Sequence, residues 1–441
     1  MPDITKRDHY YFSRRRLLKA GATLGGSSTL GSWLLKLTSA NMLNQPTGRT
    51  KVQTTLQVRG NMQAKTHVAV IGAGAFGGWT ALNILRRGAR ATLIDAWGPG
   101  NSRASSGGET RVIRGTYGPN QPYTKMAARA TQLWKENERR WNLKLLHQIG
   151  VLWMVAAGKD TDQFERGSLP VLREAGIPYQ ELSVQELRLR WPQINLEAVH
   201  WGIYEPEGGF LTARMACQAV LDGFLAEGGE YQQLAVLPRD LDGSPWDSLS
   251  LSDGSKLQAD QYVFACGPWL GKLFPETIGN RIRSTRQEVF FFGTPVGNQH
   301  FTEARLPVWA DHCDQFMYGI PGNQGRGFKI ADDTRGPEFD PTSGERTVSA
   351  EGLRSVRDYI GFRFPALQDA PLLESRVCQY ENSPDNNFII DRHPRHENIW
   401  LLGGGSGHGF KHGPALGEMV AGLVLEHKNP EALFRLGRFG K

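Results

Sequence analysis

The chain has 441 residues, 51 Lys and Arg against 44 Asp and Glu, and a formal net charge of +7. Residues 1–40 hold seven basic and two acidic side chains and so carry +5, which leaves +2 for the remaining residues. A body this close to neutral has no general electrostatic attraction for a polyanion, and this argues against a nucleic-acid-binding protein. With 39% hydrophobic and 22% charged residues the chain can bury a core, so global disorder is excluded. Its length is typical of two or more domains, or of one large domain with insertions.

The first 40 residues have the pattern of an export signal. Three arginines at 14–16 precede an apolar pair and a lysine, residues 20–35 carry no charge, and the small residues at 38–40 suit cleavage. This order resembles a twin-arginine signal peptide. We therefore expect the twin-arginine export machinery as a partner, a periplasmic or exported protein, and a cofactor loaded before export. The uncharged run is shorter than the ~20 residues that span a bilayer, so we expect no stable membrane insertion. The alternatives are a basic amphipathic helix and an uncleaved anchor.

A dinucleotide-binding unit opens the folded body. Residues 66–71 form a β-branched run typical of a buried parallel strand, and Gly72 to Gly77 follow in a G-x-G-x-x-G pattern. A helical stretch at 76–87 and a second strand at 91–94 then lead to Asp95. This order predicts that the glycines and the helix N-terminus hold a pyrophosphate while Asp95 takes ribose hydroxyls. The alternative is a glycine-rich turn without a ligand. The pattern does not separate FAD from NAD, but Asp95 would repel the 2′-phosphate of NADP. The expected cofactor contacts are Gly72, Gly74, Ala75, Phe76, Gly77 and Asp95.

Three later blocks select the flavin and indicate a family. They are Ser105–Arg114 (SSGGETRVIR), Arg376–Asp391 (RVCQYE to NFIID) and Asn398–Lys411 (NIWLLGGGSGHGFK), with a helix expected from about Pro414. Together with the turn at 204–211 and the strand end at 263–269, their order resembles the monomeric sarcosine oxidase / N-methyltryptophan oxidase family. These are FAD-dependent amine oxidases of the D-amino acid oxidase superfamily. The resemblance covers nearly everything from residue 66 onward.

The resemblance implies an α/β fold (α+β overall), with a Rossmann-like FAD-binding domain and a substrate domain built on a mixed β-sheet with helices. It implies a monomer that oxidises a C–N bond of a secondary or primary amine or an N-alkyl amino acid bearing a carboxylate. Hydride leaves the carbon for flavin N5, O2 is reduced to H2O2, and water hydrolyses the imine. Strands are expected at 150–155 and 287–292. The predicted division is a signal at 1–40, a flexible spacer at 41–64, a discontinuous FAD-binding domain at 65–115, 200–275 and 375–441, and a substrate-binding domain at 116–199 and 276–374.

Residue matches to the family place further cofactor contacts. Cys378 matches the cysteine bonded to the flavin 8α-methyl carbon, which implies covalent FAD; the alternative is a small buried hydrophobe. His408 is included on the cofactor side, although it could equally cap the backbone. The other matches on this side are Arg103, Ser106, Thr110, Arg111, Cys266, Gly267, Trp269, Gly405, Gly407, Gly409 and Lys411.

Five residues match the catalytic side of the family's site. Lys329 matches the lysine that assists the reaction of the flavin with oxygen, since a fixed cation stabilises developing superoxide charge; the alternative is an ordinary surface lysine. Arg114 and Lys411 match the pair that holds the substrate carboxylate, and the alternative is two surface ion pairs. Tyr318 and Tyr380 match aromatic residues that line the substrate cavity.

Two positions depart from the family, and other functions compete. Gly107 and Asp333 stand where the sarcosine oxidases have histidines. A glycine leaves more room, and an aspartate could attract a second positive group or form a local salt bridge. We therefore expect a substrate larger than sarcosine. The competing functions are an FAD dehydrogenase that passes electrons to a quinone or cytochrome, and a non-catalytic flavin-binding maturation factor. No metal is expected, because the four cysteines lack zinc spacing and the side chains of residues 311–314 cannot converge on one ion.

Overall fold

The computed structural model describes residues 65–156, 162–237, 241, 248–313 and 316–440. The predicted signal at 1–40 and spacer at 41–64 lie outside the described residues and stay predictions. Among the helices of the described part, each is too short or too polar to cross a membrane.

The first sheet has six strands in the order β18-β19-β12-β1-β2-β9. Every neighbouring pair is parallel except β18 with β19. Alternate residues of β1 face two cores: Val68 and Val70 pack with the helices, while Ala69 and Ile71 pack on the opposite side. The strands are β1 (His67–Ile71), β2 (Arg90–Ile94), β9 (Glu230–Gln232), β12 (Gln261–Phe264), β18 (Ile389–His393) and β19 (His396–Gly403).

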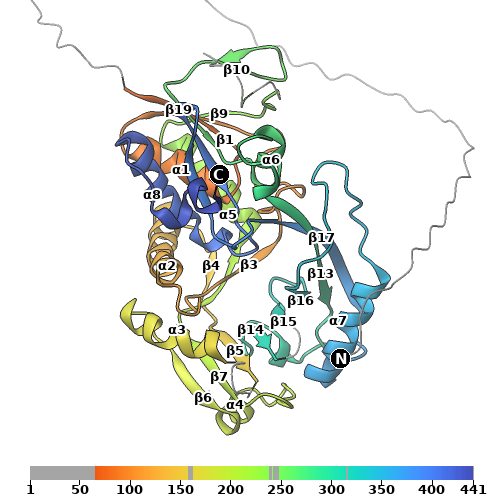
Figure 1. The fold of residues 1–441 in the computed structure, drawn as a ribbon. Coiled ribbons are helices and arrows are strands. Elements are labelled where there is room, and N and C mark those ends of the chain that lie inside the picture. Colours follow the sequence, from red (N-terminus) through yellow and green to blue (C-terminus); the bar gives the residue numbers. More distant parts are fainter. Residues whose placement is uncertain (1–64, 157–161, 238–240, 242–247, 314–315, 441) are drawn as a thin grey trace, which may run out of the picture. The chain divides into compact units, whose positions relative to one another are not determined.

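Four helices pack in the first of these cores. The glycine-lined face of α8 lies against α1, where a Cβ on Gly417 would come 2.5 Å from the carbonyl carbon of Trp79. The ring of Trp79 also meets that of Trp134 from α2 at 5.1 Å (Figure 1 shows α1, α2 and α8 together). The helices are α1 (Ala75–Arg86), α2 (Gln121–Trp141), α5 (Ala213–Ala226) and α8 (Gly413–Leu425).

The second sheet has eight strands in the order β17-β13-β16-β15-β14-β5-β7-β6. Its neighbours are antiparallel except β14 with β5, so the sheet is mixed. The strands are β5 (Val151–Val155), β6 (Gln180–Ser183), β7 (Trp201–Glu205), β13 (Arg283–Phe292), β14 (Val308–His312), β15 (Phe316–Ile320), β16 (Phe328–Asp332) and β17 (Leu372–Asn382). The remaining α-helices are α3 (Gln163–Glu174), α4 (Val184–Arg190), α6 (Leu270–Leu273) and α7 (Ala350–Arg363).

Two small sheets and short 3-10 helices complete the fold. A three-stranded sheet has the order β3-β8-β4, and β10 pairs with β11. Their bounds are β3 (Thr110–Ile113), β4 (Leu146–His147), β8 (Gly209–Thr212), β10 (Leu249–Ser250) and β11 (Lys256–Leu257). The 3-10 helices are η1 (Gly267–Trp269), η2 (Gly279–Arg281), η3 (Gln299–Phe301), η4 (Pro365–Leu367), η5 (Phe410–His412), η6 (Ala432–Phe434) and η7 (Leu436–Phe439).

The structure confirms four predicted elements, each within a few residues of its predicted bounds. They are the strand–glycine–helix–strand unit at 66–95, the strands at 150–155 and 287–292, and the helix from about Pro414.

Two elements depart from the predicted domain boundaries. β7 lies in the stretch expected for the FAD-binding domain, yet it pairs with β5 and β6 of the eight-stranded sheet. α2 lies in the stretch expected for the substrate domain, yet its Trp134 is buried with α1. In both cases strand pairing or packing with a distant segment determines where the element belongs.

Candidate functional site

A first cavity of about 390 Å³ lies at the carboxyl ends of the parallel strands of the six-stranded sheet. Its walls include Ile71 at the end of β1, Asp95 after β2, Ala265 after β12 and Gly405 after β19. In open α/β sheets this edge is where nucleotide cofactors bind, because loops and helix N-termini converge there. The geometry therefore agrees with the position predicted for the dinucleotide.

The glycine turn between β1 and α1 is sterically required. Gly72 has φ +107°, and a Cβ there would lie 2.3 Å from the Ala265 carbonyl oxygen. A Cβ on Gly77 would lie 1.9 Å from the Gly72 oxygen, so helix and turn pack closely. Asp95 accepts hydrogen bonds from the N–H groups of Ala73 at 2.8 Å and of Gly98 at 2.8 Å. Burial raises the pKa of Asp95, and these backbone donors oppose that effect.

The far side of this cavity is built by η1 and by the loop before β3. The Trp269 ring packs on the Trp97 ring at 4.9 Å. Ser106 Oγ accepts from the Ala75 N–H at 3.0 Å, which joins its loop to the start of α1. Burial raises the pKa of the Cys266 thiol, so this cysteine stays protonated. Arg103 lies outside the lining and donates to the Thr342 carbonyl at 2.8 Å.

Glu381 is a cavity residue that the sequence reasoning missed. Glu381 is 8% exposed, and among the described residues its carboxyl accepts a hydrogen bond from the Gly405 N–H alone, at 3.3 Å. Its Oε2 has no partner among the described residues, and neither has the buried Ser105 Oγ in the same lining. Burial raises the pKa of Glu381 to about 7. Buried polar atoms without partners indicate a ligand that supplies them, which fits a bound FAD.

Cys378 lies on β17, next to the cavity-lining Gln379 but not itself in the lining. Its Sγ is 3.6 Å from Arg111 Nη2. Arg111 also donates to the carbonyls of Ser105 at 2.7 Å and Thr110 at 2.9 Å, so its guanidinium is fixed between β3 and β17. The Arg111 guanidinium is therefore held beside the Cys378 thiol.

A second cavity of about 420 Å³ adjoins the first and shares Arg111, Tyr380, Gly407 and Phe410 with it. The eight-stranded sheet contributes Trp153 from β5, Tyr318 from β15 and Lys329 from β16. The remaining wall comes from the loops around Arg114 and the glycine run after β19, including His408 and Lys411.

Arg114 and Lys411, the predicted carboxylate pair, both line this second cavity. The Arg114 guanidinium lies 4.4 Å from the Tyr117 ring centroid and 4.8 Å from that of Trp153, and it donates to the Thr116 carbonyl. Lys411 Nζ donates to Tyr117 Oη and to the His408 carbonyl, both at 2.9 Å. Burial, helped by Arg114, holds the pKa of Lys411 well below its usual range. Neither cation forms an ion pair within the described part of the chain, so both can receive an anion.

Glu205 holds the loop that carries Arg114, and the sequence reasoning missed its role. It is 1% exposed and accepts from the Gly115 N–H at 2.6 Å. It also accepts from the Thr116 N–H at 3.1 Å and the Thr116 hydroxyl at 2.6 Å. A buried carboxylate with three donors fixes this backbone firmly. The predicted turn at 204–211 contains Glu205, but only the fold brings it to Arg114.

Lys329 is buried at 3% exposure, and its Nζ donates to the Thr110 carbonyl at 3.1 Å. Burial, with Arg111 acting in the same direction, lowers the pKa of Lys329 to about 7. The Lys329 ammonium lies 5.6 Å from the Tyr318 ring centroid. Burial raises the pKa of Tyr318 to about 12. The alternative of an ordinary surface lysine is therefore wrong.

Asp333 and Tyr380 form a half-buried pair in the second cavity. Tyr380 Oη donates to Asp333 Oδ1 at 2.7 Å, and burial raises the pKa of Asp333. The local salt bridge expected for Asp333 is not found among the described residues. Gly107 lines neither cavity, and a Cβ there would lie 1.8 Å from the Asn101 carbonyl oxygen. This glycine is required by its turn, so the expectation that it makes room for substrate is wrong.

His408 and Lys411 line the second cavity and not the first, although they were also expected on the cofactor side. His408 Nε2 bonds the Asn386 carbonyl at 3.0 Å, as the capping alternative described, and burial lowers its pKa to about 3. The other predicted residues found in the first lining are Gly72, Gly74, Ala75, Phe76, Asp95, Ser106, Arg111, Cys266, Gly267, Trp269, Tyr380, Gly405, Gly407 and Gly409. The lining does not include Gly77, Arg103, Thr110 or Cys378.

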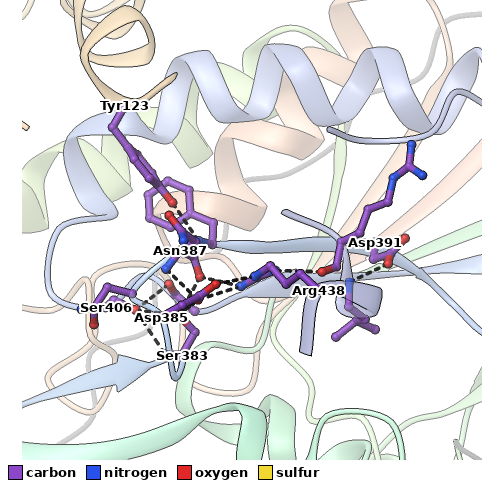
Figure 2. Close-up of polar contacts among 12 residues, drawn as sticks. Tyr123, Ser383, Asp385, Asn387, Asp391, Ser406 and Arg438 are labelled. Atoms are coloured by element: carbon purple, nitrogen blue, oxygen red, sulfur yellow. Dashed lines mark hydrogen bonds and ion pairs between the residues drawn. The ribbon is translucent and has the colours of Figure 1, made fainter. Parts of the chain in front are cut away.

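A loop at residues 383–388 forms part of the rim of the second cavity, and a network holds it in place (Figure 2). Arg438 of η7 donates to both carboxylate oxygens of Asp385 and to the Asn387 carbonyl. Ser383 Oγ donates to the same carbonyl at 2.6 Å, and the Phe388 N–H donates to Tyr123 Oη at 2.9 Å. The C-terminal segment thus fixes the shape of this rim.

A glycine turn at the carboxyl edge of a mainly parallel sheet, with a second cavity lined by a mixed sheet beside it, defines an α/β fold of the dinucleotide-binding class. Solved structures with this fold include L-proline dehydrogenase from P. horikoshii, with a TM-score of 0.73 and 22% identity over 85% of this chain and 98% of that one. A fructosyl peptide oxidase gives a TM-score of 0.72 and 22% identity over 85% and 94% of the two chains. The predicted fold class is confirmed.

The family model described as FAD dependent oxidoreductase matches residues 67–423, and the chain belongs to that family of enzymes. It is 28% identical to monomeric sarcosine oxidase of Bacillus sp. (strain B-0618) over 384 residues, 86% of this chain and 97% of that one. It is 29% identical to human peroxisomal sarcosine oxidase, over 84% and 95% of the two chains. It is 28% identical to N-methyl-L-tryptophan oxidase of Salmonella enteritidis PT4 (strain P125109), over 86% and 100%. FAD as cofactor follows from the family.

Proposed function

We propose that this enzyme oxidises the C–N bond of a secondary or primary amine that bears a carboxylate, such as an N-alkyl amino acid, with O2 as electron acceptor. The observation that carries this proposal is the pair Arg114 and Lys411, two cations without ion pairs in the described chain. They line a cavity that shares four residues with the cofactor cavity. Bound FAD, held by the lining of the first cavity, would supply the two-electron redox chemistry of this reaction, with O2 as the final oxidant and hydrogen peroxide as its product. The relatives named for sarcosine and N-methyl-L-tryptophan support this substrate class.

The chain's own residues would bind and orient the substrate. The planar Arg114 guanidinium, clamped between two rings, offers its free N–H groups to a carboxylate, and Lys411 adds a second donor. Burial lowers the pKa of Lys411, and an anion bound beside it would favour its charged form. The aromatic walls exclude water, which strengthens these charge interactions.

Flavin reduction under anaerobic conditions tests the proposal directly. The holoenzyme would be mixed with a panel of N-methyl, cyclic and unsubstituted D- and L-amino acids, and with the matching decarboxylated amines. We expect bleaching of the flavin absorbance by amino acids and at least roughly hundredfold weaker reaction of the amines that lack a carboxylate. If no amine reduces the flavin, the non-catalytic maturation factor is the better description.

Oxygen as acceptor is tested in the same panel. With the best substrate under air, peroxide should form in amounts equal to the amine consumed. A dehydrogenase would instead require a quinone or an artificial dye, and its reduced flavin would persist under air.

We also propose that FAD is bonded to Cys378. Support comes from the Arg111 guanidinium beside the thiol and from the neighbouring cavity residue Gln379. The yellow colour should stay with the chain after denaturation and precipitation in the natural enzyme, and should leave it in Cys378→Ser. Cys217→Ser serves as the control, because Cys217 is buried in α5. A flavin that leaves the natural enzyme on denaturation would exclude the bond.

A further inference from the structure

Arg335 lies at the second cavity as an exposed cation with no hydrogen bond or ion pair in the described part of the chain. It belongs to the loop after β16, two residues beyond Asp333. Its guanidinium acts electrostatically on His408, whose Nε2 bonds the rim residue Asn386 at 3.0 Å. Arg335 therefore lies within reach of the rim formed by the 383–388 loop.

The loop that carries Arg335 is fixed by a buried amide. Gln287 of β13 is 4% exposed and donates from Nε2 to the Thr334 carbonyl at 3.0 Å. Its Oε1 accepts from the Gly336 N–H at 3.0 Å, so one side chain holds the backbone on both sides of Arg335. The Arg286 N–H donates to the Pro337 carbonyl at 2.9 Å and extends the attachment along β13. The backbone that carries Arg335 is thus already fixed, and only the arginine side chain has to become ordered when it binds a ligand.

The acidic groups of this cavity are occupied by other partners. Asp385 is paired with Arg438 (Figure 2), and Asp333 accepts from Tyr380 Oη. Burial raises the pKa of Asp333, which favours its neutral form.

Arg335 is one of five basic residues in this lining. Arg111 and Lys329 donate to the backbone carbonyls of Ser105 and Thr110. Arg114 and Lys411 suffice for one carboxylate, so Arg335 is left for another anion.

We propose that the substrate carries a second anionic group at its far end, and that Arg335 binds this group at the cavity rim while Arg114 and Lys411 hold the α-carboxylate. The substrate class is then an N-alkyl dicarboxylic amino acid, of which N-methylglutamate is the model. This inference rests on the proposed function, because it names the substrate of the same site.

The test compares N-methylglutamate with N-methylglutamine in D and L forms, since the two differ in charge and hardly in shape. We expect the natural holoenzyme to favour the glutamate in kcat/KM by about 10- to 100-fold, mainly through KM. Raising the salt concentration should weaken this preference, because the outer contact is exposed.

Charge reversal separates a binding role from a structural one. In Arg335→Glu the preference should disappear, and Nα-methyllysine should gain relative to N-methylglutamate. The rate with N-methylglutamine should stay within about threefold. Arg188→Glu is the matched control, because Arg188 is exposed on α4 and lines neither cavity; it should keep the natural preference.

Each outcome decides one of the two claims. Equal use of the glutamate and the glutamine by the natural enzyme would overturn the second anion site and leave the proposed function intact. A preference for Nα-methyllysine would overturn it too, in favour of a cationic tail near Asp333. Equal losses on all substrates in Arg335→Glu would show a structural role and overturn it. If no N-methyl amino acid reduces the flavin, the proposed function itself fails.

Discussion

Lys329 is a buried lysine in the lining of the second cavity, and its pKa lies near neutrality. The pKa of Lys329 is lowered to about 7 by burial, so its charged fraction falls as the pH rises through that value. If the ammonium stabilises charge developing on oxygen, the rate constant for reoxidation of the reduced enzyme by O2 should fall above about pH 7. Lys329→Met should lower this rate constant by roughly 100- to 1,000-fold and remove its pH dependence.

The control for Lys329→Met is the reductive half-reaction, in which substrate reduces the flavin of the same variant. Anaerobic flavin reduction by substrate, followed by stopped flow, should change by less than about tenfold. An equal loss in both half-reactions would contradict a role specific to oxygen.

Arg114 should dominate substrate affinity. Arg114→Met removes a desolvated charge partner of the carboxylate, a loss of roughly 2–5 kcal/mol, or about 30- to several-thousand-fold in kcat/KM. Arg114→Lys should recover only part of this, because an ammonium lacks the planar fork. Steady-state peroxide formation measures both variants. Unchanged kcat/KM in Arg114→Met would remove the carboxylate site from this cavity.

Glu381 should link flavin redox chemistry to pH. Its carboxyl has a pKa of about 7, so it is neutral below that pH and anionic above it. An anion beside the cofactor opposes electron uptake, which would lower the flavin midpoint potential above pH 7. Glu381→Gln should match the natural enzyme at pH 6 and have a higher potential at pH 8, in spectroscopic redox titrations. Identical potentials at both pH values would place Glu381 away from the redox-active ring.

At the scale of elements, η7 near the C-terminus holds the 383–388 loop, which connects β17 to β18 and lies at the rim of the second cavity. The Leu436 N–H donates to Asp391 at 2.8 Å, and Arg438 holds Asp385 and Asn387 (Figure 2). Asn386 between them has φ +63°, in the left-handed region that asparagine adopts more readily than most residues.

Arg438→Gln should loosen this loop. Amide hydrogen exchange of residues 383–388 should quicken, and KM should rise by several-fold with little change in kcat, because the loop lines the substrate cavity and not the cofactor cavity. Arg188→Gln, on the exposed α4, is the control. Unchanged exchange in Arg438→Gln would show that the ion pair does not hold the loop.

Local patterns predicted the cofactor side of the fold well. The strand, glycine turn and acid at 66–95 lie within one chain segment, so short-range sterics and hydrogen bonding specify them. Other features depend on contacts between segments that are distant in the chain. These features are the positions of β7 and α2, the hydrogen bonds of Glu205 to the Arg114 loop, and those of Gln287 to the Arg335 loop. Nothing in the local sequence specifies such contacts. At Gly107 the prediction was wrong for a local reason. We expected this glycine to leave space for substrate, but its turn requires it, because a Cβ there would clash with the Asn101 carbonyl.

At the scale of the whole molecule, the export signal remains a prediction that lies outside the described residues. We expect the natural protein to reach the periplasm with FAD already bound. Replacement of Arg14 and Arg15 by Lys should keep it in the cytoplasm, still yellow and active. Fractionation with flavin fluorescence of each fraction measures this outcome. Export of the double variant at the natural level would exclude the twin-arginine pathway.

The strand order of the six-stranded sheet also has a consequence for biosynthesis. β19 pairs with β12 inside the sheet, and the glycine run after it lines both cavities beside the turn that follows β1. The cofactor cavity therefore needs residues as far apart in the chain as Gly72 and Gly405. A nascent chain that does not yet extend beyond β19 lacks one wall of this cavity, so we expect flavin retention to begin only after the glycine run has been made. Retained flavin would then report that the two distant segments have come together.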